Sequence, residues 1–262
     1  MPTWFPPAAE PVDEALAAAL TLPEFPRSAR YDPNWHTSNM MGPSALWLLE
    51  SIVDDLDLKP GMRVLDLGCG RALSSIFLAR EFGVQVWATD LWIAAAENRE
   101  RIEAAGLLDQ VFPIHAEAHT LPYAHGFFDA IVSIDAYHYF GTADLYMPYL
   151  AKFIRPGGRI GIVVPGLTAE IEGSTPPPHL APYWEYDWWT FHSPAWWQRH
   201  VERTGFVRVD RADLIPDGWR HWLIWTEVCN RLGHMPWPEG IPMLTEDAGQ
   251  TLNFVRLVLT RQ

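Results

Sequence analysis

Two glycines and a carboxylate mark a turn that could bind a cofactor. The run Asp66-Leu67-Gly68-Cys69-Gly70 follows a short apolar stretch, and a stretch with helical spacing of apolar residues begins directly after it. Glycines let the backbone pass close to a ligand, and the first amides of the following helix add polar contacts. The turn from Asp66 to Gly70, Cys69 included, is therefore predicted to hold a cofactor at the carboxyl end of a strand.

The residues around this turn argue against a dinucleotide. The dinucleotide fingerprint G-x-G-x-x-G requires a third glycine at position 73, where this chain has Leu73. Asp66 would repel the phosphates of a dinucleotide, but it would suit a ligand that carries an ammonium and a sulfonium group. We therefore expect S-adenosyl-L-methionine, with S-adenosyl-L-homocysteine as its product, and no metal.

Two more acidic residues follow the next predicted strands. Asp90 ends the second strand, where a Rossmann-like fold needs an acceptor for the ribose hydroxyls. Glu117 and Ala118 come after the third strand, and an acidic turn there would hold the amino group of adenine. These residues are predicted to bind the nucleoside part of the cofactor.

The segment after the fourth predicted strand supplies the candidates for catalysis. Methyl transfer from a sulfonium is an in-line displacement, so the protein must mainly align the acceptor and, where needed, remove a proton. His138 is nominated as base or as substrate-orienting group because imidazole titrates near neutral pH, and Tyr137 is a second candidate. The alternative is that both pack in the core. Weaker candidates for contact with the acceptor are His36, His192 and Glu170.

Strands and helices that alternate along the chain must position these residues. Apolar patterns predict strands at 62–67, 84–88, 111–114, 128–134, 159–164, 206–209 and 252–259, and helices at 43–56, 72–82, 93–105, 142–153, 193–204 and 217–229. This alternation indicates a parallel sheet with helices on both faces, because right-handed crossovers connect parallel strands. The predicted fold class is α/β, a Rossmann-like three-layer sandwich.

The length of 262 residues and a hydrophobic content of 48% fit one domain with additions. Residues 1–42 are expected to form an N-terminal arm or lid over the active site. The domain itself is expected over 43–262, with an aromatic-rich, substrate-covering insertion at about 168–195 and 213–250.

Tryptophan is concentrated near the end of the chain, where nine of the 14 lie between Trp184 and Trp237. One interpretation is core packing or a dimer contact. The other is an aromatic-walled acceptor pocket that would suit a planar, terpenoid or cationic amine substrate. In that case the lid would contain Tyr31, Trp35, Met40 and Met41.

In order and spacing, these motifs resemble those of the class I S-adenosylmethionine-dependent methyltransferases over about residues 40–212. The resemblance rests on Val64–Gly70, Asp90, Glu117, Phe128–Asp135 and Arg155–Gly158. It implies a seven-stranded, mostly parallel sheet with an antiparallel last strand, and it includes Asp135 in the cofactor site. It also implies that Gly68 and Gly70 lie beside the methionine part, Asp90 on the ribose, Glu117 with Ala118 near adenine, and Leu91 and Trp92 around the adenine ring. Ala72 is a mild departure, since many members have a third glycine there.

Charge and cysteine content bear on partners and compartment. The net charge of −13 disfavours nucleic acid and anionic membranes, so a small-molecule acceptor is expected for a monomer or homodimer. Two cysteines suggest no disulfide framework, and the first residues lack the pattern of a signal peptide, so the cytoplasm is expected.

Other functions stay open to different degrees. A protein of this fold that binds S-adenosylmethionine for sensing or for a non-methylating reaction would keep the same cofactor residues. An NAD-dependent oxidoreductase is disfavoured by Leu73 and Asp66. Base or glutamine methylation is disfavoured because Asp135-Ala136-Tyr137-His138 stands where an Asn-Pro-Pro-Tyr motif would be needed.

Overall fold

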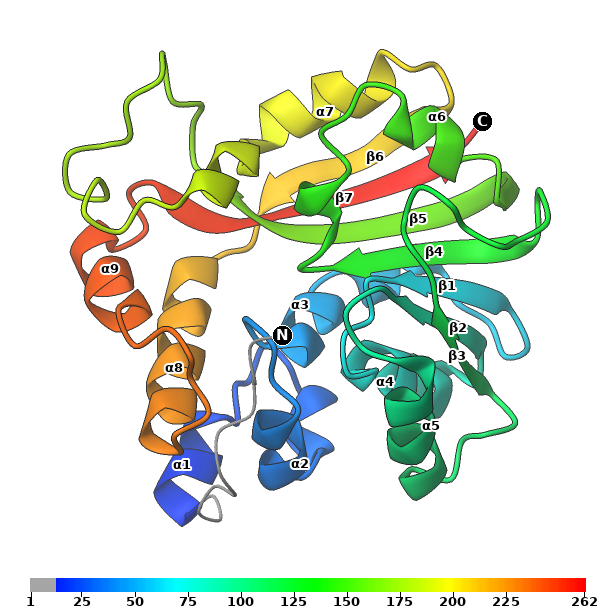
Figure 1. The fold of residues 1–262 in the computed structure, drawn as a ribbon, viewed down its shortest axis with the longest axis horizontal. Helices are drawn as coiled ribbons and strands as arrows, with labels where there is room; N and C mark the ends of the chain where they lie inside the picture. Colours follow the sequence, from blue (N-terminus) through cyan, green and yellow to red (C-terminus); the bar gives the residue numbers. More distant parts are fainter. Residues whose placement is uncertain (1–12) are drawn as a thin grey trace.

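One seven-stranded sheet runs through the computed structural model, which describes residues 13–262 (Figure 1). Its strands are β1 (Arg63–Leu67), β2 (Gln85–Asp90), β3 (Val111–His115), β4 (Phe128–Ile134), β5 (Ile154–Leu167), β6 (Val207–Leu214) and β7 (Leu252–Arg261). In each of β1 and β4 every residue but one is buried, as expected for strands that are covered on both faces. The order across the sheet is β3-β2-β1-β4-β5-β7-β6.

The direction of the strands confirms the expected fold class. β1 runs parallel to β2 and β4, β2 runs parallel to β3, and β4 runs parallel to β5. β7 is antiparallel to both of its neighbours, β5 and β6. The chain is therefore an α/β Rossmann-like sandwich with a mostly parallel sheet and an antiparallel last strand.

Helices cover both faces of the sheet (Figure 1). One face carries α3 (Ala45–Glu50), α4 (Leu73–Phe82) and α5 (Ala95–Ala104), whose apolar residues pack with β1 and β2 in one cluster. The other face carries α6 (Tyr146–Leu150) and α7 (Pro194–Glu202), which pack with β5 and β7 in a second cluster.

A third group of helices lies at one end of the sheet. It contains α1 (Glu14–Ala19), α2 (Pro33–Ser38), α8 (Gly218–Arg231) and α9 (Gly240–Asp247). Figure 1 shows α1 and α2 beside α8, and buried Leu16 and Trp225 share one apolar cluster. The described part of the expected N-terminal arm thus packs against α8, while residues 1–12 lie outside the described part of the chain.

Several predicted boundaries differ from the structure. The helix expected at 142–153 is only α6, and the strand expected at 206–209 continues to Leu214, so 213 and 214 belong to the sheet and not to an insertion. Two helices, α2 and α9, were not expected in their proline-containing segments. α2 forms because Pro33 occupies its first turn, where no amide hydrogen is needed, and because the Asp32 carboxylate caps it.

Candidate functional site

The order of the strands reverses between β1 and β4, and ligands of open α/β sheets bind at the carboxyl ends of such strands. Gly68 follows β1 and Ala136 comes shortly after β4, and the two turns touch. A Cβ placed on Gly68 would lie 2.3 Å from the Cβ of Ala136. Gly68 also has a φ of 76°, which favours glycine. The glycine turn and the segment after β4 therefore form one site.

The Asp90 carboxylate ties the two cofactor turns together. Its Oδ2 accepts a hydrogen bond of 2.8 Å from the Gly70 amide. Its Oδ1 accepts from the amides of Trp92 and Ile93 at 2.7 and 2.8 Å. A carboxylate has about four acceptor positions, so Asp90, which is 8% exposed, keeps capacity for a ribose hydroxyl.

Asp66 lies differently from the sequence-based expectation. It is fully buried, and its Oδ2 accepts hydrogen bonds of 2.6 Å from the hydroxyls of Ser74 and Ser75. Burial raises the pKa of Asp66 to about 6. The side chain therefore joins β1 to α4 beneath the glycine turn through Oδ2, while its Oδ1 has no hydrogen-bond partner within residues 13–262. Cys69 is buried as well, so only its backbone is available in the turn.

The residues predicted to lie near adenine are accessible to different extents. Leu91 and Trp92 are 49% and 68% exposed, and the Trp92 ring meets the edge of Tyr139 at a centroid distance of 5.5 Å. The Glu117 carboxylate is held by the backbone amide and the ring of His119, at 2.9 and 2.6 Å. Ala118, half-buried, accepts a hydrogen bond from a tyrosine through its carbonyl oxygen. Leu91 and Trp92 thus offer open apolar surface next to Asp90.

Residues 38–42, here called the covering segment, lie over the glycine turn. The Arg71 guanidinium donates a hydrogen bond of 2.9 Å to the Ser38 carbonyl oxygen. A Cβ on Gly70 would approach the Met41 sulfur to 2.9 Å. Of the four residues expected in a lid, only Met41 is therefore on the turn.

The other three expected lid residues pack elsewhere. Met40 is buried in the cluster that contains Trp225. Tyr31 stacks on Trp35 at 5.5 Å and contacts Phe77 of α4 at the same distance. These contacts hold the arm to the body of the protein.

Tyr137 and His138 form the short 3-10 helix η3 (Tyr137–Tyr139) after β4. Tyr137 is fully buried, its ring packs against Trp197, and its hydroxyl has no hydrogen-bond partner within residues 13–262, so it lies in the core in this structure. His138 is 2% exposed, lies against Tyr139 and Phe191, and burial lowers its pKa to about 3. A neutral imidazole of this kind can orient a substrate by a hydrogen bond, but it is a poor base at neutral pH.

Asp135 precedes η3 at the end of β4 and has an unusual environment. Its backbone is in the left-handed region, with a φ of 56°. A Cβ on Gly42 of the covering segment would lie 2.5 Å from its Oδ2. Within residues 13–262 no group donates a hydrogen bond to its carboxyl, and burial raises its pKa to about 8. The sequence placed this residue in the cofactor site, but only the structure shows that its carboxyl accepts no hydrogen bond from residues 13–262.

The three weaker candidates are in structural contacts. His36 is buried, and its Nε2 lies 3.0 Å from the Ser44 hydroxyl. His192 stacks on Trp196 at 3.6 Å, and its Nδ1 lies 3.0 Å from the Glu170 carboxylate. These contacts stabilise α3 and α7, respectively.

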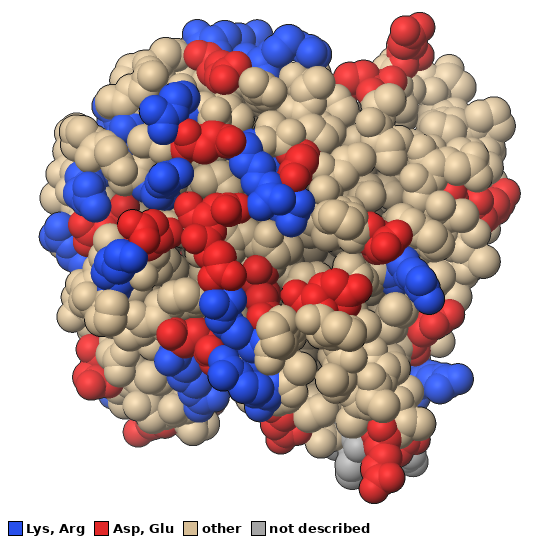
Figure 2. All heavy atoms as spheres, turned by 180° about the vertical axis from the view of Figure 1, so that it is seen from behind, with Lys and Arg blue, Asp and Glu red and all other residues tan. Residues whose placement is uncertain are grey.

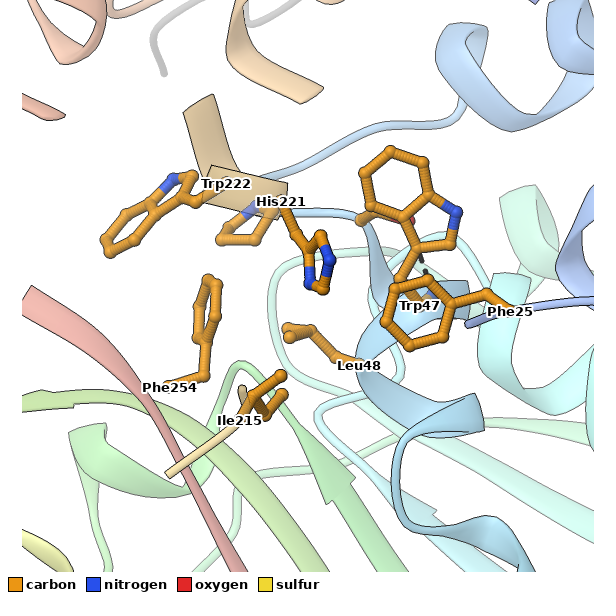
Figure 3. A pocket seen from close by; sticks show the side chains of 9 residues that line it. Phe25, Trp47, Leu48, Ile215, His221, Trp222 and Phe254 are labelled. Carbon is orange, nitrogen blue, oxygen red and sulfur yellow. Dashed lines mark hydrogen bonds between the residues drawn. The ribbon is translucent and has the colours of Figure 1, made fainter. Parts of the chain in front are cut away.

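The tryptophans after position 183 divide among several packing clusters. Trp184 and Trp188 pack together in one cluster, and Trp197 is buried in another. Trp222 lines a narrow recess, with free space of only about 10 Å³, in which His221 lies between two groups of apolar side chains (Figure 3). The lining residues are Phe25, Pro43, Ser44, Trp47, Leu48, Ile215, His221, Trp222 and Phe254. Rings crowd this recess, so most of the tryptophans serve packing.

The described surface carries few other signals. Figure 2 shows acidic and basic side chains interspersed on one face, without a continuous basic patch. Across residues 13–262 no group of three metal-binding side chains comes together, and no helix there is long and apolar enough to cross a membrane.

Comparison with known proteins agrees with this geometry. Residues 64–158, which run from β1 into β5, match a family model described as a methyltransferase domain. Over 135 residues the chain is 36% identical to the methyltransferase GfsG of Streptomyces halstedii. The aligned part covers 48% of this chain and 49% of GfsG. The chain thus spans about half the length of this relative.

Solved structures share the fold at low sequence identity. A sarcosine dimethylglycine methyltransferase from Galdieria sulphuraria, described as putative, superposes with a TM-score of 0.66 at 20% identity, covering 82% of this chain and 83% of the other. The [4+2]-cyclase SpnF superposes with a TM-score of 0.64 at 16% identity, covering 85% and 84%. Chains of this architecture therefore include one named as a methyltransferase and one named as a cyclase.

Proposed function

We propose that this chain, whose residues 64–158 match a methyltransferase domain, is a class I S-adenosylmethionine-dependent methyltransferase that transfers the methyl group of S-adenosyl-L-methionine to a small-molecule acceptor. The observation that carries the proposal is the position of Asp90. Its carboxylate connects Gly70 to Trp92 at the point where the strand order reverses, and it keeps free acceptor capacity.

The residues around Asp90 fit the cofactor. Gly68 and Gly70 both have positive φ and present a backbone surface that any Cβ would fill, which suits the methionine part. Asp90 accepts hydrogen bonds from the ribose, and the exposed Leu91 and Trp92 flank adenine. The bound cofactor supplies an activated methyl group, and the protein aligns the acceptor with it.

The net charge of the chain bears on the class of acceptor. It is −13, which favours neutral or cationic small molecules over nucleic acid. We place the protein in the cytoplasm, as a monomer or homodimer. His138 is a candidate for orienting the acceptor, because its Nδ1 has no hydrogen-bond partner within residues 13–262.

A second candidate function is a non-methylating one that uses the same cofactor site. The likeness to the [4+2]-cyclase SpnF favours this alternative, because that protein shares the fold under a different named activity. In that case the cofactor would bind, but no S-adenosyl-L-homocysteine would form with any acceptor.

Calorimetric titration with S-adenosyl-L-methionine, S-adenosyl-L-homocysteine and NAD tests the proposal. We expect micromolar dissociation constants for the first two and no binding of NAD. Asp90→Ala should abolish binding. The matched control Asp109→Ala removes an exposed carboxylate near β3 and should bind like wild type.

Turnover then separates the two candidate functions. A panel of amine, hydroxyl and thiol acceptors is incubated with S-adenosyl-L-methionine, and S-adenosyl-L-homocysteine is quantified. Product with any acceptor supports the methyltransferase. Binding without product supports the non-methylating alternative, and preference for NAD overturns both.

A further inference from the structure

The carboxyl of Asp135 stands apart from the other carboxyls near the glycine turn. Asp66 accepts two hydroxyl hydrogen bonds, and Asp90 accepts three from backbone amides. Within residues 13–262 the Asp135 carboxyl accepts none, although its side chain is partly buried. A partly buried carboxyl that accepts no hydrogen bond from the protein is available to a bound molecule, and titratable groups in perturbed surroundings concentrate at functional sites.

The position of Asp135 suits contact with a substrate. It follows β4, whose carboxyl end meets that of β1 where the strand order reverses. The next residue, Ala136, touches Gly68, so Asp135 is beside the glycine turn. From the other side Gly42 of the covering segment lies against Oδ2. Asp135 therefore lies between the cofactor turn and the segment that covers it.

We infer that Asp135 contacts the methyl acceptor and takes the proton that the nucleophilic atom of the acceptor loses. This inference rests on the proposed function. An N–H or O–H proton passes to a carboxylate oxygen of Asp135. The electron pair of that nitrogen or oxygen then forms the bond to the methyl carbon. The carbon–sulfur bond breaks with its electrons on sulfur, which leaves a neutral thioether, and the proton passes later from Asp135 to water.

Asp135 suits this step better than His138 does. The imidazole is enclosed by Tyr139 and Phe191 and stays neutral at physiological pH. Burial of the Asp135 carboxyl raises its pKa to about 8, which makes its anion a base matched to neutral pH. The proton acceptor is therefore a carboxylate, where the sequence favoured an imidazole.

The groups around Asp135 are acidic or neutral. From η3, Tyr139 faces it, and the raised pKa of Tyr139 comes from burial first and then from the charges of Asp135, Asp187 and Glu185. Both Glu185 and Asp187 belong to the segment around the 3-10 helix η4 (Tyr186–Thr190), which contacts η3. This negative field favours a neutral or cationic acceptor, such as an amine or an alcohol, over an acid.

The isosteric variant Asp135→Asn tests the inference in three measurements. The dissociation constant for S-adenosyl-L-homocysteine should stay within about twofold of wild type. Turnover with an acceptor found in the panel should fall about a hundredfold or more. Wild-type kcat/KM should rise with pH through a midpoint near 8 and then level off, and this rise should be absent in the variant. The control Asp109→Asn should match wild type in all three.

Two results would overturn the inference. A loss of more than about tenfold in S-adenosyl-L-homocysteine affinity would assign Asp135 to the cofactor, as the sequence suggested. If Asp135→Asn turns over at the wild-type rate and with the wild-type pH profile, Asp135 takes no part in the reaction. A wild-type protein that binds no cofactor, or forms no product, contradicts the proposed function instead.

Two further measurements keep the test decisive if Asp135→Asn unfolds or no acceptor is found. Gly42→Ala keeps the carboxyl of Asp135 but places a methyl group 2.5 Å from its Oδ2, which is too close. Turnover should therefore fall, and the midpoint of the pH dependence of kcat/KM should shift. Carboxyl carbon-13 NMR of wild type should show Asp135 titrating near pH 8. An ordinary value near 4 would mean that a partner holds the carboxyl, and would refute the inference.

Discussion

The indole Nε1 of Trp225 donates a hydrogen bond of 2.8 Å to the carbonyl oxygen of Gly42, 183 residues earlier in the chain. Trp225 lies on α8, and Gly42 ends the covering segment that reaches Asp135 and the glycine turn. This bond joins the tryptophan-rich C-terminal part to the N-terminal arm. At least one of the clustered tryptophans therefore supports the site without lining it.

Trp225→Phe should destabilise the protein and weaken cofactor binding. The ring is 1% exposed and packs on His36 and Trp47, so the smaller side chain leaves a cavity, and the Gly42 carbonyl oxygen loses its donor. We expect a loss of about 2–4 kcal/mol in the free energy of unfolding in urea. Tyr186→Phe, at an exposed ring, should change it by less than about 0.5 kcal/mol. Unchanged stability would mean that the bond does not anchor the arm.

Gly68→Ala should abolish cofactor binding, and Gly106→Ala is its matched control. Both glycines have positive φ, at 76° and 71°, so alanine costs roughly 1–2 kcal/mol of backbone strain at either position. Only at Gly68 would the new Cβ overlap another atom, the Cβ of Ala136, whereas the space at Gly106 is open. Calorimetry with S-adenosyl-L-homocysteine should therefore show binding by Gly106→Ala alone. Equal binding by both variants would contradict the close approach of the two turns.

Asp66→Asn should stabilise the protein increasingly as pH rises from 4 to 7. The folded-state pKa of Asp66 is about 6, above its ordinary 3.8, so between these values the folded state holds more protons than the unfolded state. The contribution of Asp66 to stability therefore falls as pH rises through this window. Two pKa units correspond to about 3 kcal/mol, which is the largest gain expected for the variant at pH 7 relative to pH 4. Urea unfolding at several pH values measures this gain, and a constant difference would contradict it.

His138→Phe should make stability less sensitive to acid. The pKa of His138 is lowered to about 3 by burial, so the folded state binds fewer protons and stability falls as pH drops below 6.5. The slope approaches about 1.4 kcal/mol per pH unit below pH 6, and the variant should lose about 2 kcal/mol less than wild type between pH 6.5 and 4.5. His36, buried with a pKa near 3, keeps its own contribution in both proteins. His125→Phe, at an exposed ring, should retain the wild-type slope.

The residues of the glycine turn and Asp90 could be predicted because their positions depend on local order along the chain. A strand that ends in glycines before a helix puts Gly68 and Gly70 at the carboxyl edge of a parallel sheet, whatever else packs around them. The same alternation of strands and helices determines the fold class. The parallel part of the sheet agrees with this expectation, and the antiparallel last strand agrees with what the resemblance to class I methyltransferases implied.

The identity of the candidate base depended on contacts between distant segments. Asp135 and His138 are three residues apart, and sequence alone favoured the histidine because of its ordinary pKa. Phe191 and Tyr139 enclose that imidazole, whereas the Asp135 carboxyl is left against Gly42 without a hydrogen-bond partner within residues 13–262. Burial then reverses the ordinary order of the two groups, lowering one pKa and raising the other.

By itself the sequence thus determined the sheet, the cofactor turn and the carboxylate at Asp90, since each follows from neighbours along the chain. Tertiary structure decided that Asp66 lies beneath the turn, that Tyr137 belongs to the core and that Asp135 faces the covering segment. The physical reason is that the burial of a side chain and its hydrogen-bond partners depend on which distant segments of the chain pack together. The spacing of residues along the sequence does not reveal those contacts.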